Sequence, residues 1–264
     1  MSESLMPFIW VAIALPVLLM LQRWIQTHLH GISLLVTGKP ERAVLLYAVI
    51  LFPGVLLHEL SHWVTAKLLG VRTGSFSILP RQKPDGSIQL GYVEYYRSKT
   101  LDPVRESLIG GAPMIVGTAV ILLIGFNVFS VADLATAIQS GDMDTLTFAL
   151  ATLFQTDYVL LWIYLIFAIS NAMLPSKSDR RAWPAFVVAM FILAGIIYLL
   201  DLQNEIASGL VGPAARVFGY LGIAFSVAIG VDLFFMLILV ILEAFVGRIK
   251  GVSVVYGSSD GSRT

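Results

Sequence analysis

Long apolar stretches dominate the chain, and a helix that crosses a bilayer needs about 20 mostly apolar residues. Six stretches come close to this length or exceed it. They cover residues 5–25, 43–70, 104–129, 158–174, 184–200 and 219–246. We therefore predict an all-α polytopic membrane protein with about six transmembrane helices.

Two of the connections between these stretches have a distinct pattern. Residues 71–100 are too polar to span, and runs with strand character at 75–79 and 87–96 flank Asp85-Gly86, a strong turn pair. This pattern predicts a small β-hairpin between the second and third spans. Residues 130–157 contain four Asp and no Lys or Arg, which indicates a solvated loop or a surface helix.

The composition narrows the possible functions. Of the 264 residues, 57% are hydrophobic and 13% charged, against roughly a quarter charged in soluble domains. This excludes a water-soluble enzyme and, with zero net charge, a basic nucleic-acid-binding protein. The chain has no cysteine, so any metal ligands must come from its four histidines and its carboxylates.

The distribution of Lys and Arg predicts the orientation. With six spans, the connections that share a side with the N-terminus hold eleven Lys and Arg, and the opposite connections hold four. Because cytoplasmic loops carry the excess of positive charge, both termini are expected in the cytoplasm. We expect a multi-pass integral protein of a prokaryotic plasma membrane, in contact with lipid.

The second apolar stretch contains the motif His58-Glu59-Leu60-Ser61-His62. Residues four apart stack on one face of a helix, so both imidazoles can reach a single Zn²⁺. Glu59 can take a proton from a water molecule whose pKa zinc lowers to about 7. The alternative is that both histidines are buried structural residues, with Glu59 paired to Lys67 or to an arginine. Ionisable residues inside a membrane are costly, which favours a functional site.

The position of the motif places this site within the bilayer, in its cytoplasmic half. Eight residues separate His62 from Gly70, which is about 12 Å of helix. Water must therefore reach a cavity between helices. Pro53-Gly54 lies one turn before His58 and is expected to bend or loosen the helix there, or to be an ordinary packing kink.

In these residues the chain resembles the site-2 protease family of intramembrane zinc metalloproteases. The resemblance rests on HELSH within residues 52–70, on Gly110-Gly111-Ala112-Pro113, and on Asn171 followed eight residues later by Asp179. Pro175, Arg180 and Val116 depart from the family's pattern, so the resemblance is to a minimal, divergent member. It implies a core at residues 43–200, flanked by an N-terminal span with an amphipathic connection (1–42), a C-terminal span (201–250) and a disordered tail (251–264).

The resemblance also implies a third zinc ligand, Asp179. A catalytic zinc usually takes three protein ligands and a water, and Asp179 is expected on the same side of the membrane as the end of the HELSH helix. The alternative is that Asp179 caps the helix that begins near Trp183-Pro184. Asp232 is the reserve ligand, although it is expected to face the bundle interior as a polar contact.

Asn171 has two possible roles. As a substrate-binding residue near the metal, its carboxamide would hold a substrate backbone or stabilise a developing oxyanion. Alternatively it makes an interhelical hydrogen bond, as polar residues in membranes commonly do. The stretch from Gly110 to Gly117 is expected to serve close helix packing.

These expectations combine into one hypothesis for the function. The chain is a zinc metalloendopeptidase that hydrolyses a peptide bond in or near a transmembrane segment of a membrane protein substrate. The ligands are His58, His62 and Asp179, and Glu59 is the catalytic base. The alternative is a non-proteolytic metal-binding membrane protein, a transporter or a regulator, that retains the site. The oligomeric state is left open.

Overall fold

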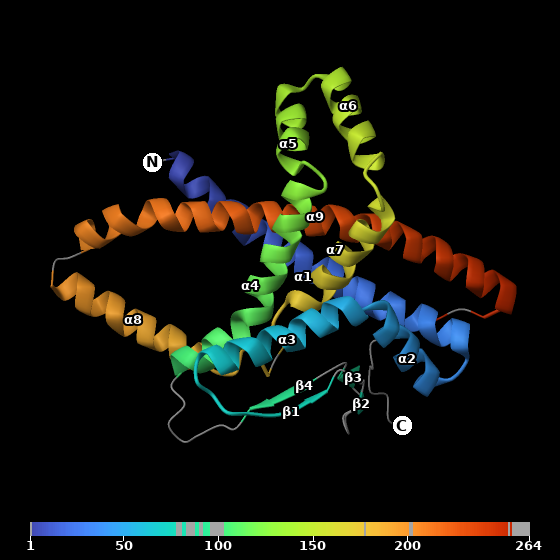
Figure 1. Cartoon of the computed structure of the whole chain (residues 1–264), viewed down its shortest axis with the longest axis horizontal. Coiled ribbons are helices and arrows are strands. Elements are labelled where there is room, and N and C mark those ends of the chain that lie inside the picture. The colour runs from blue at the N-terminus through green and yellow to red at the C-terminus, as the bar shows by residue number, and fades with distance from the viewer. Residues whose placement is uncertain are drawn as a thin grey trace, which may run out of the picture.

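The computed structural model describes residues 2–77, 81–82, 88–89, 92–95, 103–176, 178–200, 203–252 and 254 (Figure 1). The described chain is largely helical. Its helices are α1 (Ser2–Thr37), α2 (Pro40–Ile50), α3 (Phe52–Leu68), α4 (Pro103–Asn127), α5 (Val131–Ser140), α6 (Met143–Phe154), α7 (Val159–Met173), α8 (Trp183–Leu199) and α9 (Gln203–Lys250).

Three of the described helices are long and apolar enough to cross a membrane: Leu5–Thr37 within α1, the whole of α4, and Gly209–Lys250 within α9. Two bent pairs, α2 with α3 and α6 with α7, raise the number to five if each pair is one span. The predicted fifth span forms α8, which is apolar but only 17 residues long. The chain is thus a helical integral membrane protein with three to five candidate spans, and six remains a prediction.

The predicted second span is not one straight helix. Helices α2 and α3 meet at Leu51 with a bend of 73°. Pro53 has no N–H with which to continue the hydrogen bonding of α2, so the bend expected at Pro53-Gly54 is present but lies two residues earlier, at Leu51. The Tyr164 hydroxyl of α7 donates to the carbonyl of Ile50 at 3.0 Å and satisfies one of the acceptors at this break.

The long helices α1 and α9 pack along each other, and α4 and α7 pack against α9 (Figure 1). Buried apolar side chains at this contact include Leu18 of α1, Ile121 of α4, Ile166 of α7 and Phe225 of α9. Helix α3 lies across α4 and α7 on the other side. The junction of α3, α4 and α7 is where the HELSH motif meets the rest of the chain.

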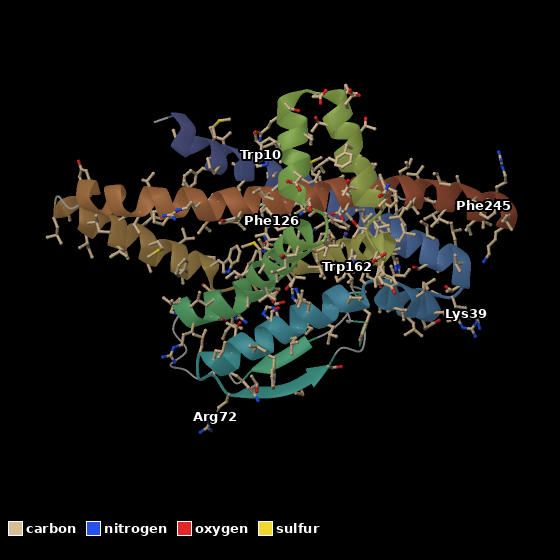
Figure 2. All side chains as sticks on the ribbon, turned by 45° about the horizontal axis from the view of Figure 1, so that its top comes forward. Trp10, Lys39, Arg72, Phe126, Trp162 and Phe245 are labelled. Carbon is tan, nitrogen blue, oxygen red and sulfur yellow. The ribbon has the colours of Figure 1, made fainter. Side chains whose placement is uncertain are left out.

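Helices α5 and α6 occupy the acidic connection at 130–157 and project from the bundle as a pair (Figure 1). The acidic connection thus forms two helices, no residue of α6 is buried in the bundle, and α6 with α7 is also one of the two bent pairs that could form a span. Asp142 caps α6 by accepting hydrogen bonds from the backbone N–H groups of Asp144 and Thr145. Elsewhere on the surface, Lys39 and Arg72 point away from the helices (Figure 2).

The described part of the connection between α3 and α4 contains four short strands. Strand β1 (Thr73–Ser77) pairs antiparallel with β4 (Tyr92–Tyr95), and β2 (Arg81–Gln82) pairs antiparallel with β3 (Ile88–Gln89). The Asp85-Gly86 turn of the predicted hairpin and most of the predicted disordered tail lie outside the described residues.

Candidate metal centre

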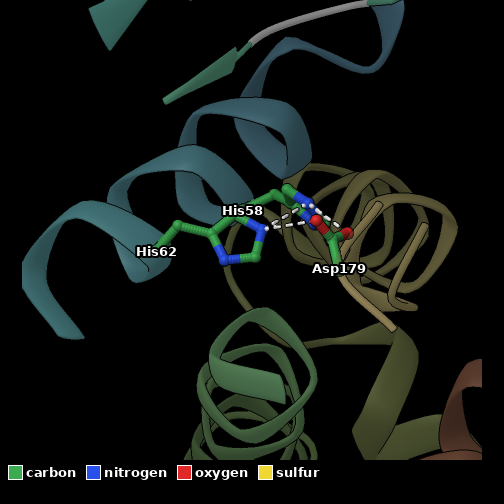
Figure 3. Close-up of side chains that lie close together, drawn as sticks. All are labelled: His58, His62 and Asp179. Atoms are coloured by element: carbon green, nitrogen blue, oxygen red, sulfur yellow. Dashed lines mark hydrogen bonds and ion pairs between the residues drawn. The ribbon is translucent and has the colours of Figure 1, made fainter. Parts of the chain in front are cut away.

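The structure brings His58, His62 and Asp179 together into a group that can bind a metal ion. Both imidazoles project from α3 toward the Asp179 carboxylate (Figure 3). The Nε2 atoms of the two histidines are 3.1 Å apart. His58 Nε2 lies 3.6 Å from one carboxylate oxygen of Asp179, and His62 Nε2 lies 3.5 Å from the other.

Backbone carbonyls fix the orientation and the tautomer of both imidazoles. His58 Nδ1 lies 2.7 Å from the carbonyl oxygen of Ala172, and His62 Nδ1 lies 2.8 Å from that of Ile109. A carbonyl only accepts, so each Nδ1 carries the proton and donates it. In the neutral rings each Nε2 then carries a lone pair and no proton. Two lone pairs and a carboxylate facing one another repel unless a proton or a metal ion lies between them, and the group can hold a metal ion in this way.

Two features of the chain leave these carbonyls free to accept. In an α-helix the Ile109 carbonyl would accept from residue 113, but Pro113 has no N–H. The Ala172 carbonyl lies in the last turn of α7, where carbonyls lack a helical partner. Pro113 therefore leaves the Ile109 carbonyl of α4 free to accept the hydrogen bond that orients His62.

Asp179 is held by the turn that contains it. Its Oδ2 accepts a hydrogen bond from the backbone N–H of Ser176 at 2.7 Å. This hydrogen bond favours the ionised form of the carboxyl group, whereas burial opposes it. Helix α8 has Ala182 at its N-cap and no side-chain cap, so Asp179 does not cap it.

Small residues allow the elements of the site to approach closely. A Cβ atom on Gly110 of α4 would lie 2.0 Å from the backbone oxygen of Asp179, and one on Gly54 of α3 would lie 1.8 Å from that of Ala168. A Cβ atom on Gly117 would lie 2.6 Å from the Cβ of Met173. The expected packing role of the stretch from Gly110 to Gly117 is confirmed, and Gly110 acts directly on the segment that carries Asp179.

Glu59 follows His58 on α3 and is buried, with 8% of its surface exposed. No ion pair joins it to a Lys or Arg of the described residues. Lys67, the partner considered in the structural alternative, instead places its Nζ 4.0 Å from the ring centroid of Trp63. Glu59 is thus a carboxyl group beside the two histidines, without a basic partner in the described part of the chain.

Asn171 and Asp232 belong to a different cluster. The Asn171 carboxamide donates to Asp232 Oδ1 of α9 at 2.9 Å, which is the interhelical hydrogen bond considered above. Asp232 is fully buried and lies with Ser170 and Asn171, not with the two histidines. It is the polar contact of the bundle interior, and the structure does not bring it to the metal group as a reserve ligand.

Gln22 and Gln26 of α1 contribute to this region and were not predicted from the sequence. Their Nε2 groups donate to the carbonyls of Ser170 and Asn171 in the last turn of α7. Pro175 has no N–H for the Asn171 carbonyl, which explains why an outside donor is needed there. Two side-chain amides four residues apart lie on one face of an apolar helix, and such groups need hydrogen-bond partners in a membrane. This spacing could therefore have predicted a polar contact with another helix.

Comparison of the chain with protein-family models, with curated proteins and with solved structures finds no match. The resemblance to the site-2 proteases therefore rests on the residues themselves.

The Gly110 contact leads to a prediction. Replacing Gly110 by alanine should push the Asp179 segment away from the histidines and lower metal affinity about tenfold or more, as losing a supporting contact does. Overpacking should also cost about 1–3 kcal/mol of stability. Competition with a chelator and thermal unfolding measure the two effects.

The neighbouring residue supplies the control. A Cβ atom on Gly111 meets nothing within 4 Å, so Gly111→Ala should leave metal affinity unchanged. Equal affinities in the two variants would mean that the close approach at Gly110 does not position Asp179.

Proposed function

We propose that the chain is an intramembrane zinc metalloendopeptidase that hydrolyses a peptide bond in or near a transmembrane segment of another membrane protein. The observation that carries the proposal is the orientation of His58 and His62. A backbone carbonyl accepts a hydrogen bond from the Nδ1 of each ring, so both Nε2 lone pairs face Asp179. A buried glutamate without a basic partner beside them adds a proton acceptor.

The spacing of the three ligand atoms supports zinc. Ligand atoms about 2.0–2.1 Å from a tetrahedral zinc ion are about 3.3 Å from one another. The two Nε2 atoms are 3.1 Å apart, and each lies 3.5 or 3.6 Å from a different oxygen of the Asp179 carboxylate. Two imidazoles and one carboxylate form a set that zinc takes in catalytic sites, where a fourth position is left for water or substrate. Such an ion, when bound, supplies a Lewis acid and makes water a nucleophile at neutral pH.

The remaining chemistry belongs to Glu59. As the base it accepts a proton from the attacking water, whose oxygen bonds to the substrate carbonyl carbon. It then delivers that proton to the leaving nitrogen as the carbon–nitrogen bond breaks. The products are a carboxylic acid and an amine, and the acid then loses its proton to solvent. Because a helix hides its carbonyls, the substrate segment must unwind locally, and an edge of the strands at 73–95 offers backbone groups for strand addition.

The proposed setting is a prokaryotic plasma membrane, with six spans and both termini in the cytoplasm. This topology counts α2 with α3 as one span, and counts α7 and α8 as one span each. The site then lies in the cytoplasmic half of the bilayer, with lipid around the apolar helices and a transmembrane protein as substrate.

The first experiment measures the metal. The chain has only four histidines, His28 and His30 in α1 and the two of the motif, so the pairs serve as matched variants. Purified wild type should carry about one zinc ion per chain. His58→Ala with His62→Ala should lose it, whereas His28→Ala with His30→Ala should keep it. Equal zinc in the two double variants would contradict the site.

The second experiment distinguishes a protease from a metal-binding transporter or regulator. A model transmembrane peptide in lipid vesicles is incubated with wild type, with chelated protein, and with chelated protein supplied again with Zn²⁺ or Mg²⁺. Cleavage that stops on chelation and returns only with Zn²⁺ supports proteolysis. Full zinc content without cleavage of several such peptides would favour the non-proteolytic alternative.

A further inference from the structure

A second polar cluster lies in the bundle where α7 meets α9. Asp232 of α9 has no exposed surface. Its Oδ1 accepts hydrogen bonds from Ser170 Oγ and from Asn171 Nδ2, both at 2.9 Å. The residue is the only acidic one between Glu205 and Glu243 of α9, and the two helical turns before it carry the buried apolar residues Phe225 and Ala228.

The other oxygen of the carboxyl group has no donor. Asp232 Oδ2 and the Asn171 carboxamide oxygen are both buried without a hydrogen-bond partner in the described part of the chain. Both are acceptors when the carboxyl group is ionised. The cluster therefore has two acceptor oxygens to satisfy and a negative charge to balance.

The elements around Asp232 supply no positive charge to it. Helix α9 packs against α1, α4 and α7. Helix α7 has no charged residue, and the charged residues of α4 are Arg105 and Glu106 near its N-terminus. None of these makes an ion pair with Asp232.

The charged side chains of α1 and α9 also face elsewhere. Arg23 of α1 is exposed, and His28 lies 3.9 Å from Glu243 of α9. Lys250 donates to the carbonyls of Leu35 and Val36 at the end of α1. His30 and Arg216 make no ion pair with Asp232 either, and Arg248 lies beyond Glu243 near the end of α9.

An ionised carboxylate buried in an apolar bundle without a paired cation is among the most costly arrangements in a membrane protein. The two hydrogen bonds to Oδ1 do not remove this cost, because they leave the net charge and Oδ2 unbalanced. A single positive charge at Oδ2 balances both.

We propose that Asp232, with Asn171 and Ser170, is a binding site for one positive charge, either a proton or a small monovalent cation such as Na⁺. A bound proton turns Oδ2 into a donor, and a bound cation would be shared by Asp232 Oδ2 and other oxygens of the cluster. This site is separate from the metal group and does not depend on proteolysis.

The test compares the thermal unfolding of the full chain with that of Asp232→Asn, from pH 5.5 to 8.5, in NaCl and in choline chloride of equal ionic strength. Asparagine has nearly the shape of a neutral carboxyl group, so the variant should match wild type at low pH. If folded wild type holds a proton that the unfolded chain releases, its midpoint should fall with rising pH, relative to the variant, by about 3 °C per pH unit. If it holds a cation, Na⁺ but not choline should raise the midpoint of wild type alone.

Asp133→Asn on the exposed face of α5 is the control and should behave as wild type. Identical responses of wild type and Asp232→Asn to both pH and Na⁺ would overturn the proposal.

If Asp232→Asn does not fold, the infrared spectra of wild type and of Glu59→Gln test the proposal instead. A carboxylic acid C=O band in both proteins supports the proton. No such band, together with no effect of Na⁺ on the wild-type midpoint, overturns the site.

Discussion

Glu59→Gln is expected to abolish most hydrolysis while leaving the metal in place. The substitution keeps the size and shape of the side chain but removes its ability to accept and return a proton. General acid–base catalysis is worth about 10²–10⁴-fold, so cleavage of a model transmembrane peptide should fall by at least that range. Zinc content should stay near one ion per chain, because the proposed ligands are His58, His62 and Asp179.

The burial of Glu59 makes this test specific. A buried carboxyl group without a basic partner loses no ion pair when it becomes an amide, so stability should change little. The matched control is Glu41→Gln at the exposed start of α2, which should leave both cleavage and zinc unchanged. Undiminished cleavage by Glu59→Gln with full zinc content would mean that another group is the base.

The second large effect is expected at Asp179. Asparagine at this position still accepts the hydrogen bond from the Ser176 N–H, so the turn should be kept, but a neutral amide is a poor zinc ligand. Losing a supporting residue of a metal site typically costs about 10–100-fold in affinity, and the loss of a ligand should cost at least as much. Chelator competition measures the affinity, and cleavage should fall with occupancy.

Asp157→Asn, at an exposed position just before α7, controls for the removal of one negative charge. It should leave zinc affinity unchanged. Retention of zinc at wild-type affinity by Asp179→Asn would show that two histidines and another group suffice. Asp232 would be a poor candidate for that group, since it lies with Ser170 and Asn171.

The sequence could predict those parts of the site that depend on local geometry. The i, i+4 spacing of His58 and His62 fixes their shared helix face. The break at Pro53 follows from a missing N–H, and the gathering of Asp179 with the two histidines was expected from the resemblance and from the topology.

The remaining features of the site could not be predicted, because they depend on which segments of the chain come into contact in the fold. The carbonyls of Ile109 and Ala172 carry no sequence signal as acceptors, although Pro113 shows after the fact why one of them is free. The role of Gly110 is a close approach between α4 and the Asp179 turn, which only the packed chain reveals. The bends of 73° between α2 and α3 and of 89° between α6 and α7 leave the span count at three to five.

The three proposed ligands are made at different times during synthesis. His58 and His62 belong to α3, whereas Asp179 follows α7, so α4, α5, α6 and α7 leave the ribosome in between. The carbonyls that orient the imidazoles also belong to α4 and α7. The histidines thus enter the bilayer before any of their partners, and the complete set of ligands exists only after α7 has inserted and the Asp179 turn has docked on Gly110. Loading of the proposed zinc ion is therefore expected to be a late step of biogenesis, so that zinc content would report on completed insertion as well as on affinity.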